Sequence, residues 1–241
     1  MDAISINNLV KNYDGVEALK NISLSIKEGE FFALLGPNGA GKTTAINILM
    51  GLANKTSGEA SLFGKDVVKD YREARSFIGL VPQEFNFDIF EKVYNILYFN
   101  AGYFGLPRKE RPSRIKEVLN DLKLWGKKDA QARELSGGMK RKLMIARALI
   151  HKPKILILDE PTAGVDVETR KDMWEYFKRL NKEGTTILLT THYIEEAEEL
   201  CQNIAILNEG KIIKLDTKDN LLKSHGKKLE EIFLHLINDG K

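Results

Sequence analysis

The chain has 241 residues, 43% of them hydrophobic, which is enough for a sizeable buried core in one large domain or two small ones. Its 37 Lys and Arg residues nearly balance its 34 Asp and Glu residues, so the net charge of +3 argues against a strongly electrostatic nucleic-acid binder. Cys201 is the only cysteine, which excludes an internal disulfide, and we expect a packed thiol there, in a reducing compartment.

The apolar runs of the sequence are short. Runs such as residues 155–158 and 187–189 fall far below the roughly 18 to 20 residues that a membrane-spanning helix needs. The first residues also lack the uninterrupted apolar stretch of a secretory signal. If the protein works at a membrane, we expect another chain to supply the span.

Short β-rich runs come first along the chain. Apolar residues alternate with polar ones over residues 4–9 and 19–26, which predicts antiparallel strands with one face in water. Residues 31–35 are apolar throughout and predict a strand buried on both sides. Four more buried strands are predicted over residues 77–81, 155–158, 186–190 and 204–207. Helical patterns lie between them, so the expected fold class is α/β with a mostly parallel sheet.

Residues 90–148 interrupt this alternation. They contain no convincing strand, and their helical periodicity is carried by Ile115, Val118, Leu119 and Leu122. This pattern predicts a helical subdomain inserted into the connectivity of the sheet. After residue 207, a turn at Gly210 leads to a predicted strand over 211–215 and a final amphipathic helix over about 229–237.

A glycine-rich segment follows the strand predicted at residues 31–35. Its spacing, a glycine, four residues and then Gly-Lys-Thr, is that of a phosphate-binding loop, and a helical pattern follows it. Glycines let the backbone curl so that N–H groups point inward, and the helix start adds its positive dipole end. Lys42 would reach the β- and γ-phosphates, and the Thr43 hydroxyl would bind Mg²⁺. The residues of this predicted ATP site are Gly36, Pro37, Asn38, Gly39, Ala40, Gly41, Lys42, Thr43 and Thr44.

Two carboxylates stand at the end of the apolar strand predicted at residues 155–158. Asp159 is predicted to hold Mg²⁺ through water, which leaves Glu160 as the candidate general base or water-orienting residue for attack on the γ-phosphate. Seen alone, such a pair is more often solvated than catalytic. The phosphate loop favours catalysis, because parallel strands deliver their C-terminal ends to one edge of a sheet.

Two more polar residues follow predicted strands. His192 comes after residues 186–190 and would sense or stabilise the γ-phosphate at the same edge. Gln83 comes after residues 77–81 and suits a contact with the metal or with the attacking water. Either residue alone would be an ordinary polar group at a strand end.

A second anion-binding helix start is predicted at the LSGG sequence of residues 135–138. Ser136 is a good N-cap, and Gly137 and Gly138 expose backbone N–H groups. One ATP already has a full cradle at the phosphate loop, so this second site is redundant within a single chain. An ordinary capped helix is the alternative, and the residues of the segment do not exclude it.

The ordered set of these segments resembles the motifs of ABC ATPases: the phosphate loop, Gln83, LSGG at 135–138, ILILDE at 155–160, AGVD at 163–166 and His192. The resemblance covers nearly the whole chain. It implies a P-loop (RecA-like) core, an N-terminal antiparallel β subdomain and an inserted helical subdomain. It further implies one ABC ATPase domain with a nucleotide-binding core at about 1–88 and 149–215, a helical subdomain at about 89–148 and a C-terminal extension at about 216–241.

The resemblance also implies a head-to-tail homodimer with two ATP molecules, each between the phosphate loop of one copy and residues Ser136 to Gly138 of the other. This arrangement would explain the redundant anion site. By the same resemblance Tyr13 would stack on adenine, Gln83 would link the nucleotide to a membrane subunit, and Asp166 would connect the two sites across the dimer.

Residues 135–166 resemble the ABC-2 export branch, including YadG-like subunits, rather than the importer ATPases that usually place Gln where Met139 stands. Such subunits pair with a separate membrane-spanning permease, whose short cytoplasmic helix docks beside the helical subdomain. The apolar, aromatic-rich residues 85–104 could line that groove or belong to a helix core. The implied location is cytoplasmic, peripheral on the cytoplasmic face of the inner or plasma membrane.

Three other functions fit parts of the pattern. A soluble ABC ATPase in iron–sulfur cluster assembly would use the same chemistry on a scaffold. ABC ATPases of translation or DNA maintenance usually carry two such domains or a long coiled coil between the phosphate loop and LSGG, and this sequence has neither. A P-loop kinase has no use for LSGG. The leading hypothesis is therefore a transport-coupled ATP hydrolase using ATP and Mg²⁺, with no nucleic-acid partner and a transported substrate that the sequence leaves open.

Overall fold

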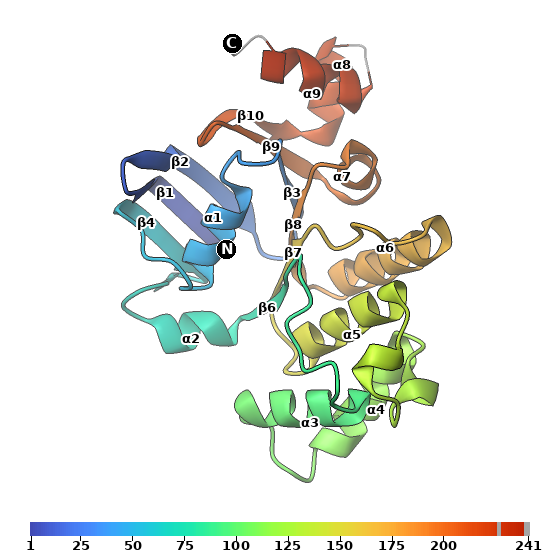
Figure 1. Ribbon diagram of the computed structural model, residues 1–241. Helices are drawn as coiled ribbons and strands as arrows, with labels where there is room; N and C mark the ends of the chain where they lie inside the picture. The colour runs from blue at the N-terminus through green and yellow to red at the C-terminus, as the bar shows by residue number, and fades with distance from the viewer. Residues whose placement is uncertain (226–227, 239–241) are drawn as a thin grey trace.

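Two β-sheets form the framework of the computed structural model, which describes residues 1–225 and 228–238 (Figure 1). A four-stranded antiparallel sheet has the order β2-β1-β4-β5, with β1 (Asp2–Tyr13), β2 (Val16–Lys27), β4 (Ser57–Leu62) and β5 (Lys65–Asp66). A six-stranded sheet has the order β10-β9-β3-β8-β7-β6, and only the β10–β9 pair is antiparallel. Its strands are β3 (Phe31–Leu35), β6 (Ile78–Val81), β7 (Ile155–Asp159), β8 (Thr186–Thr191), β9 (Asn203–Asn208) and β10 (Lys211–Thr217).

Helices cover both faces of the six-stranded sheet (Figure 1). α1 lies between the two sheets, α5, α6 and α7 lie on the opposite face, and α3 and α4 extend from one end beside α5. In the described part of the chain, no helix has the length and apolar content that crossing a bilayer requires. The helices are α1 (Lys42–Leu49), α2 (Tyr71–Ser76), α3 (Val93–Tyr103), α4 (Arg111–Asp121), α5 (Gly137–Leu149), α6 (Val167–Lys182), α7 (Ile194–Leu200), α8 (Lys218–His225) and α9 (Leu229–Asn238), with 3₁₀ turns at Trp125–Lys127 and Ala132–Glu134.

The central strand β3 contributes to two hydrophobic cores. Phe31, Ala33 and Leu35 pack into the core shared with α3 to α7. Phe32 and Leu34 point the other way, into the core between the two sheets that contains α1. Successive side chains of a strand face opposite sides, so an uninterrupted apolar run is what a strand covered on both faces requires.

The predicted α/β fold with a mostly parallel sheet is confirmed, and so are the antiparallel N-terminal strands. The predicted N-terminal strand is too short, because β1 continues through register irregularities around Leu9 that break its alternation. The sequence patterns did not indicate β4, β5 or α2. β4 has the sequence SGEASL, whose polar residues do not indicate a strand. It nevertheless pairs with β1, with Leu62 opposite Ile4.

Other predicted elements differ by small amounts. The strand predicted at 77–81 begins at Ile78, since Phe77 is the C-cap of α2. In residues 90–148 the structure has helices and 3₁₀ turns, and their extended contact is an isolated bridge between Lys92 and Gln131. The predicted packed thiol is confirmed, because Cys201 is buried and free just after α7. Of the segment 216–241, residues 226–227 and 239–241 lie outside the described part of the chain.

The ends of four parallel strands meet at one edge of the larger sheet. β3 leads into the loop before α1, and its neighbour β8 pairs Thr191 with Leu35. β7 lies next to β8 with Asp159 opposite Thr190, and β6 lies next to β7. This register carries residues that are more than 100 positions apart in the chain to a common edge, as parallel sheets with crossover helices do.

Candidate active site

The loop between β3 and α1 curls because glycines occupy the positions that a side chain could not. Gly39 and Gly41 have φ values of 81° and 108°, in the left-handed region. A Cβ on Gly36 would lie 2.3 Å from the Leu207 carbonyl oxygen, and one on Gly41 would lie 2.6 Å from the Ala18 carbonyl oxygen. The loop is therefore packed against β9 and β2, and its backbone can approach a bound group closely.

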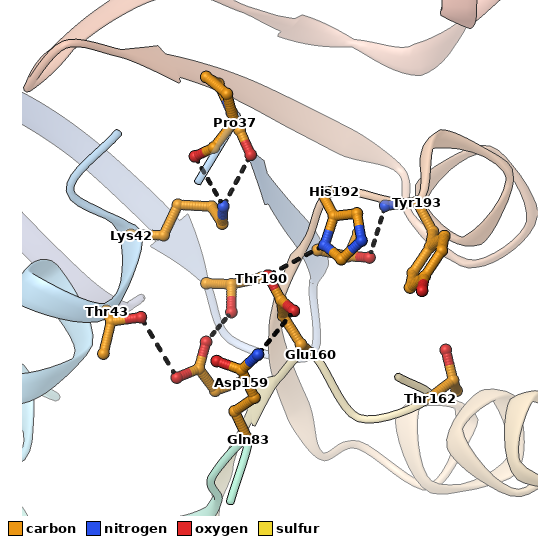
Figure 2. A network of polar contacts seen from close by, with 12 residues as sticks. Pro37, Lys42, Thr43, Gln83, Asp159, Glu160, Thr162, Thr190, His192 and Tyr193 are labelled. Carbon is orange, nitrogen blue, oxygen red and sulfur yellow. Dashed lines mark hydrogen bonds and ion pairs between the residues drawn. The ribbon is translucent and has the colours of Figure 1, made fainter. Parts of the chain in front are cut away.

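Lys42 holds its ammonium group inside this loop. Nζ donates hydrogen bonds to the carbonyl oxygens of Gly36 at 2.7 Å and Pro37 at 3.1 Å (Figure 2). The residue is 6% exposed, and burial lowers its pKa, while the charges of Glu160 and Asp159 act in the opposite direction. α1 has no side-chain cap at Gly41, so its first N–H groups remain available to an anion.

Asp159 lies at the end of β7 between two threonine hydroxyls. Thr190 donates to Oδ1 at 2.5 Å, and the Thr43 hydroxyl lies 3.5 Å from Oδ2 (Figure 2). Burial raises the pKa of Asp159, and the Thr190 hydrogen bond opposes that rise. The predicted proximity of Asp159 to the phosphate loop is observed in this geometry.

Glu160 is held by two partners that come from different strands. Gln83 Nε2 donates to Oε2 at 3.1 Å, and His192 Nδ1 lies 3.0 Å from Oε1 (Figure 2). Glu160 also has a φ of 49°, which is unusual for a side chain of this size and is typical of strained functional positions. Each carboxylate oxygen thus has its own partner, and the group has a fixed orientation.

A pocket of about 330 Å³ is lined by residues 38–44, Ala18, Gln83 and Glu160, and Asp159 and His192 lie behind it, in contact with Thr43 and Glu160. A pocket of this size suits a phosphate-bearing ligand of moderate size. A larger open pocket of about 400 Å³ lies between α4, α5 and α6. Its charged lining mixes both signs and has no acid pair at a strand end, so it does not resemble a catalytic site. It is lined by Lys123, Lys142, Arg179, Asp121, Asp172 and Glu175 among others.

The remaining predicted site residues do not line the phosphate-loop pocket. Ser136 caps α5 by accepting a hydrogen bond from the Met139 N–H at 3.3 Å, and Ser136 and Gly137 are exposed. Asp166 caps α6 through the Thr169 N–H at 2.9 Å, which lowers the pKa of its carboxyl. A Cβ on Gly138 would lie 3.0 Å from Thr169, so the starts of α5 and α6 are adjacent.

Tyr13 also lies outside that pocket. It ends β1, 43% of it is exposed, and Lys11 Nζ lies 4.3 Å from the centre of its ring. A cation over an aromatic face is a favourable contact. Its ring is a surface group near the N-terminal sheet.

Three buried polar residues in or near the site were not predicted from the sequence. Thr190 is a strand-end residue, and only the register between β7 and β8 reveals that it binds Asp159. Glu196 is fully buried and accepts hydrogen bonds from Thr162 at 2.9 Å and Trp174 at 3.1 Å. Arg141 is buried in α5. The sequence carries no signal for the last two, because Glu196 is one of four glutamates in α7 and Arg141 lies between Lys140 and Lys142.

Comparisons with known proteins agree with this geometry. The family model for ABC transporters matches residues 19–163. The Nod factor export ATP-binding protein I of Burkholderia thailandensis is 44% identical over 92% of this chain and 73% of its own length. The linearmycin resistance ATP-binding protein LnrL of Bacillus subtilis is 40% identical over 92% of this chain and 72% of its own.

Solved structures match over most of the chain. The ATP-binding subunit of an ABC transporter has a TM-score of 0.89 at 27% identity, over 97% of this chain and 99% of its own. The dimeric, post-hydrolysis state of the cassette MJ0796, bound to ADP and Pi, has a TM-score of 0.81 at 30% identity, over 89% and 98%. The chain therefore belongs to the ABC transporter family, as an ATP-binding, ATP-hydrolysing cassette homologous to the ATP-binding proteins of export-type transporters.

Proposed function

We propose that this chain is the motor of an export-type transporter, and that two copies close head to tail around two ATP molecules to drive it. The observation that carries the proposal is the Glu160 carboxylate, which stands at the phosphate-loop pocket with one oxygen facing Gln83 and the other facing His192. An oriented carboxylate beside a phosphate cradle supports ATP hydrolysis, and the similarity to a Nod factor export ATP-binding protein supports its coupling to export.

The residues in and around the pocket have separate roles in ATP binding and hydrolysis. The backbone N–H groups of residues 36–44 bind the phosphates, and the Lys42 ammonium lies beside the β- and γ-phosphate oxygens. Glu160 orients the attacking water and takes its proton, because its carboxylate is fixed by two hydrogen-bonding partners. His192 keeps Glu160 in place and stabilises charge on the γ-phosphate, and Tyr13 stacks on adenine.

The donor set around Asp159 suits Mg²⁺. Mg²⁺ prefers oxygen ligands and is usually bound by one or two protein groups together with phosphate oxygens and water. The Thr43 hydroxyl and the Asp159 carboxylate lie 3.5 Å apart, with Gln83 nearby, which is a set of that kind. Mg²⁺ bound there would neutralise charge on the phosphates. Among the described residues no group of three or more His, Cys, Asp and Glu side chains forms a metal cage, so phosphate oxygens would complete the site.

The exposed start of α5 supports the head-to-tail dimer. Ser136 and Gly137 are exposed and do not line the chain's own pocket, and Asp166 caps the neighbouring helix start. In a closed dimer, Ser136, Gly137 and Gly138 of one copy contact the γ-phosphate in the loop of the other, and Asp166 lies between the two sites. The dimeric MJ0796 cassette is a precedent among structural relatives.

A membrane-spanning permease is the proposed partner. Five large apolar side chains between residues 85 and 103 are exposed, which is more than solvation alone favours. Phe85 lies two residues after Gln83, so a permease helix docked there would lie close to a residue that contacts Glu160. The set is Phe85, Ile89, Phe90, Phe99 and Tyr103.

The same proposal includes the location, the direction of transport and the subdivision of the chain. The chain works on the cytoplasmic face of the membrane, where ATP is available. Export is the proposed direction because a 44% identical relative is a Nod factor export ATP-binding protein. The nucleotide-binding core spans about 1–88 and 149–215, the helical subdomain about 89–148, and a C-terminal extension follows.

The decisive experiment is Glu160→Gln in the full chain. Gln keeps the size of the side chain but cannot accept a proton, so Mg²⁺-dependent turnover should fall by about 100-fold or more. ATP binding should persist, and a stable ATP-bound dimer should accumulate on size exclusion. Normal turnover in this variant would remove Glu160 from its role.

The proteins that co-purify with this chain distinguish the proposed function from its rivals. Co-purification from membranes with a multi-span protein supports the transporter, whereas a cytosolic iron–sulfur scaffold contradicts it. Turnover that RNA or DNA stimulates would contradict it as well.

A further inference from the structure

Arg141 is a buried charged residue that contacts the backbone of Gln83. It lies on α5, five residues after Ser136, and is 4% exposed. Its guanidinium carbon lies 5.1 Å from the centre of the Phe85 ring. Burial lowers the pKa of Arg141, and the Asp159 carboxylate opposes this effect. A charge in such a position is costly unless hydrogen bonds satisfy it, so its partners reveal its use.

Those partners are the two peptide groups on either side of the Gln83 Cα. Nη1 donates to the Pro82 carbonyl oxygen at 2.8 Å, and Nη2 donates to the Gln83 carbonyl oxygen at 2.9 Å. A planar guanidinium that donates two bonds fixes the orientation as well as the distance of its acceptors. The backbone of Gln83 is therefore clamped to α5.

Gln83 carries this constraint to the acid that orients water. Its side-chain amide donates to Glu160 Oε2 at 3.1 Å (Figure 2). Three hydrogen bonds thus join α5 to Glu160: two from Arg141 to the peptide groups of Gln83 and one from the Gln83 side chain to the carboxylate. All three have ordinary lengths, so a displacement of Arg141 would alter the position of Glu160.

α5 itself is suited to transmit movement. At its C-terminal end, a Cβ on Gly79 of β6 would lie 2.3 Å from the Ala148 carbonyl oxygen, so the helix is in close contact with that strand. At its N-terminal end it carries Ser136 and Gly137, which are exposed, and Gly138, which is partly buried. Arg141 lies about 7.5 Å along the helix axis from Ser136, which is within one rigid segment.

We infer that Arg141 is a positioning residue that couples the two ATP sites of the dimer, by passing the state of the α5 start to Gln83 and Glu160 of the same chain. The inference rests on the proposed head-to-tail dimer, in which the α5 start contacts the ATP held by the other copy. When that ATP seats against Ser136 to Gly138, α5 shifts, and Arg141 moves the Gln83 peptides. Each ATP thereby sets the geometry in which the other is hydrolysed.

A purely structural role is the alternative, in which Arg141 only satisfies two carbonyl groups after β6. The two roles differ in kinetics. Lost stability reduces the amount of active enzyme and leaves the dependence of rate on ATP concentration unchanged. Lost coupling lowers kcat and also the Hill coefficient, which for two coupled sites can approach about 2.

Arg141→Gln, Arg141→Lys and Arg147→Gln separate these roles in the full chain. Arg147 is a matched control, since it lies on the same helix and donates to Asn86 at 2.9 Å but not to Gln83. For each variant, ATPase rate is measured against ATP concentration. ATP affinity and ATP-induced dimerisation are measured in the same variants carrying Glu160→Gln.

The expected result for Arg141→Gln is a kcat lowered about 10- to 100-fold and a Hill coefficient near about 1, with ATP affinity unchanged. Arg141→Lys keeps the charge and should have a higher kcat and a higher Hill coefficient than Arg141→Gln. If Arg141→Gln does not fold, Arg141→Lys is tested in its place. Arg147→Gln should match the wild type. A variant at Arg141 with lower kcat and an unchanged Hill coefficient would overturn the inference. Failure of the proposed function looks different, because then the Glu160→Gln protein itself does not dimerise with ATP.

Discussion

Two helix starts in this chain combine glycines with a hydroxyl residue, yet their surroundings are opposite. At α1 the phosphate loop is packed against β2 and β9, and two buried carboxylates, Asp159 and Glu160, stand beside it. At α5, Ser136 and Gly137 are exposed, and Ser136 hydrogen-bonds to its own helix. Similar local chemistry thus produces a complete pocket in one place and an open surface in the other. This difference supports the proposed dimer, in which the α5 start contacts the ATP of a second copy.

The largest expected effect is on ATP affinity, which should depend on the α1 start and not on the α5 start of the same chain. Lys42→Ala removes the ammonium from the loop, so the Kd for ATP should rise about 1000-fold, because charge-assisted bonds to phosphate are strong. Fluorescent-ATP titration of the monomer measures it. Ser136→Ala is the counterpart at α5 and should leave monomer affinity within about twofold. A large affinity loss in that counterpart would show that α5 serves its own chain's ATP.

The next effect concerns turnover. Gly137→Asp adds a negative charge at the exposed α5 start. A helix N-terminus tolerates such a charge, but the new carboxylate would repel the γ-phosphate of ATP bound by the other copy. We expect kcat to fall about 100-fold, with monomer ATP affinity unchanged. The matched control is Gly137→Ala, which changes the backbone in the same way without charge and should stay within about threefold. Equal losses in both variants would point to backbone effects instead.

Stability should respond in opposite directions at the two starts. Gly41→Ala forces a Cβ into a left-handed position 2.6 Å from the Ala18 oxygen, so it should lower the free energy of unfolding by about 2–4 kcal/mol. Gly137→Ala meets no atom within 4 Å and should raise it by up to about 0.5 kcal/mol. Urea unfolding without nucleotide measures both. If the two changes had the same sign, the contrast in packing would be wrong.

The smallest effect concerns Glu196, which links Thr162 after β7 to Trp174 on α6. Burial raises the pKa of Glu196, opposed by its hydrogen bonds and by the charge of Arg170 on α6. A carboxyl with a raised folded-state pKa stabilises the fold below its unfolded pKa of about 4.3, and this contribution is lost as pH rises toward the folded value. Glu196→Gln should therefore be about 1 kcal/mol less stable than the wild type near pH 5, with a smaller difference at pH 8. A pH-independent difference would contradict the raised pKa.

Local patterns predicted much of the molecule. The phosphate loop could be recognised because its glycines, Lys42 and the following helix are neighbours in the chain, and covalent geometry sets their spacing. The continuous apolar runs of β3, β7 and β8 identified buried parallel strands for the same reason. β4 was not predicted, because its polar sequence forms a strand only by pairing with β1.

What the sequence determined by itself is the identity and order of the reactive groups: the loop with Lys42, the Asp159–Glu160 pair and the capped glycines of α5. Only the tertiary structure decided which of them meet. Thr190 reaches Asp159, Gln83 and His192 reach Glu160, and Arg141 reaches Gln83, through strand register and helix packing between segments 31 to 77 residues apart. The physical reason is that hydrophobic periodicity specifies which faces are buried but carries no information on which buried strand lies beside which.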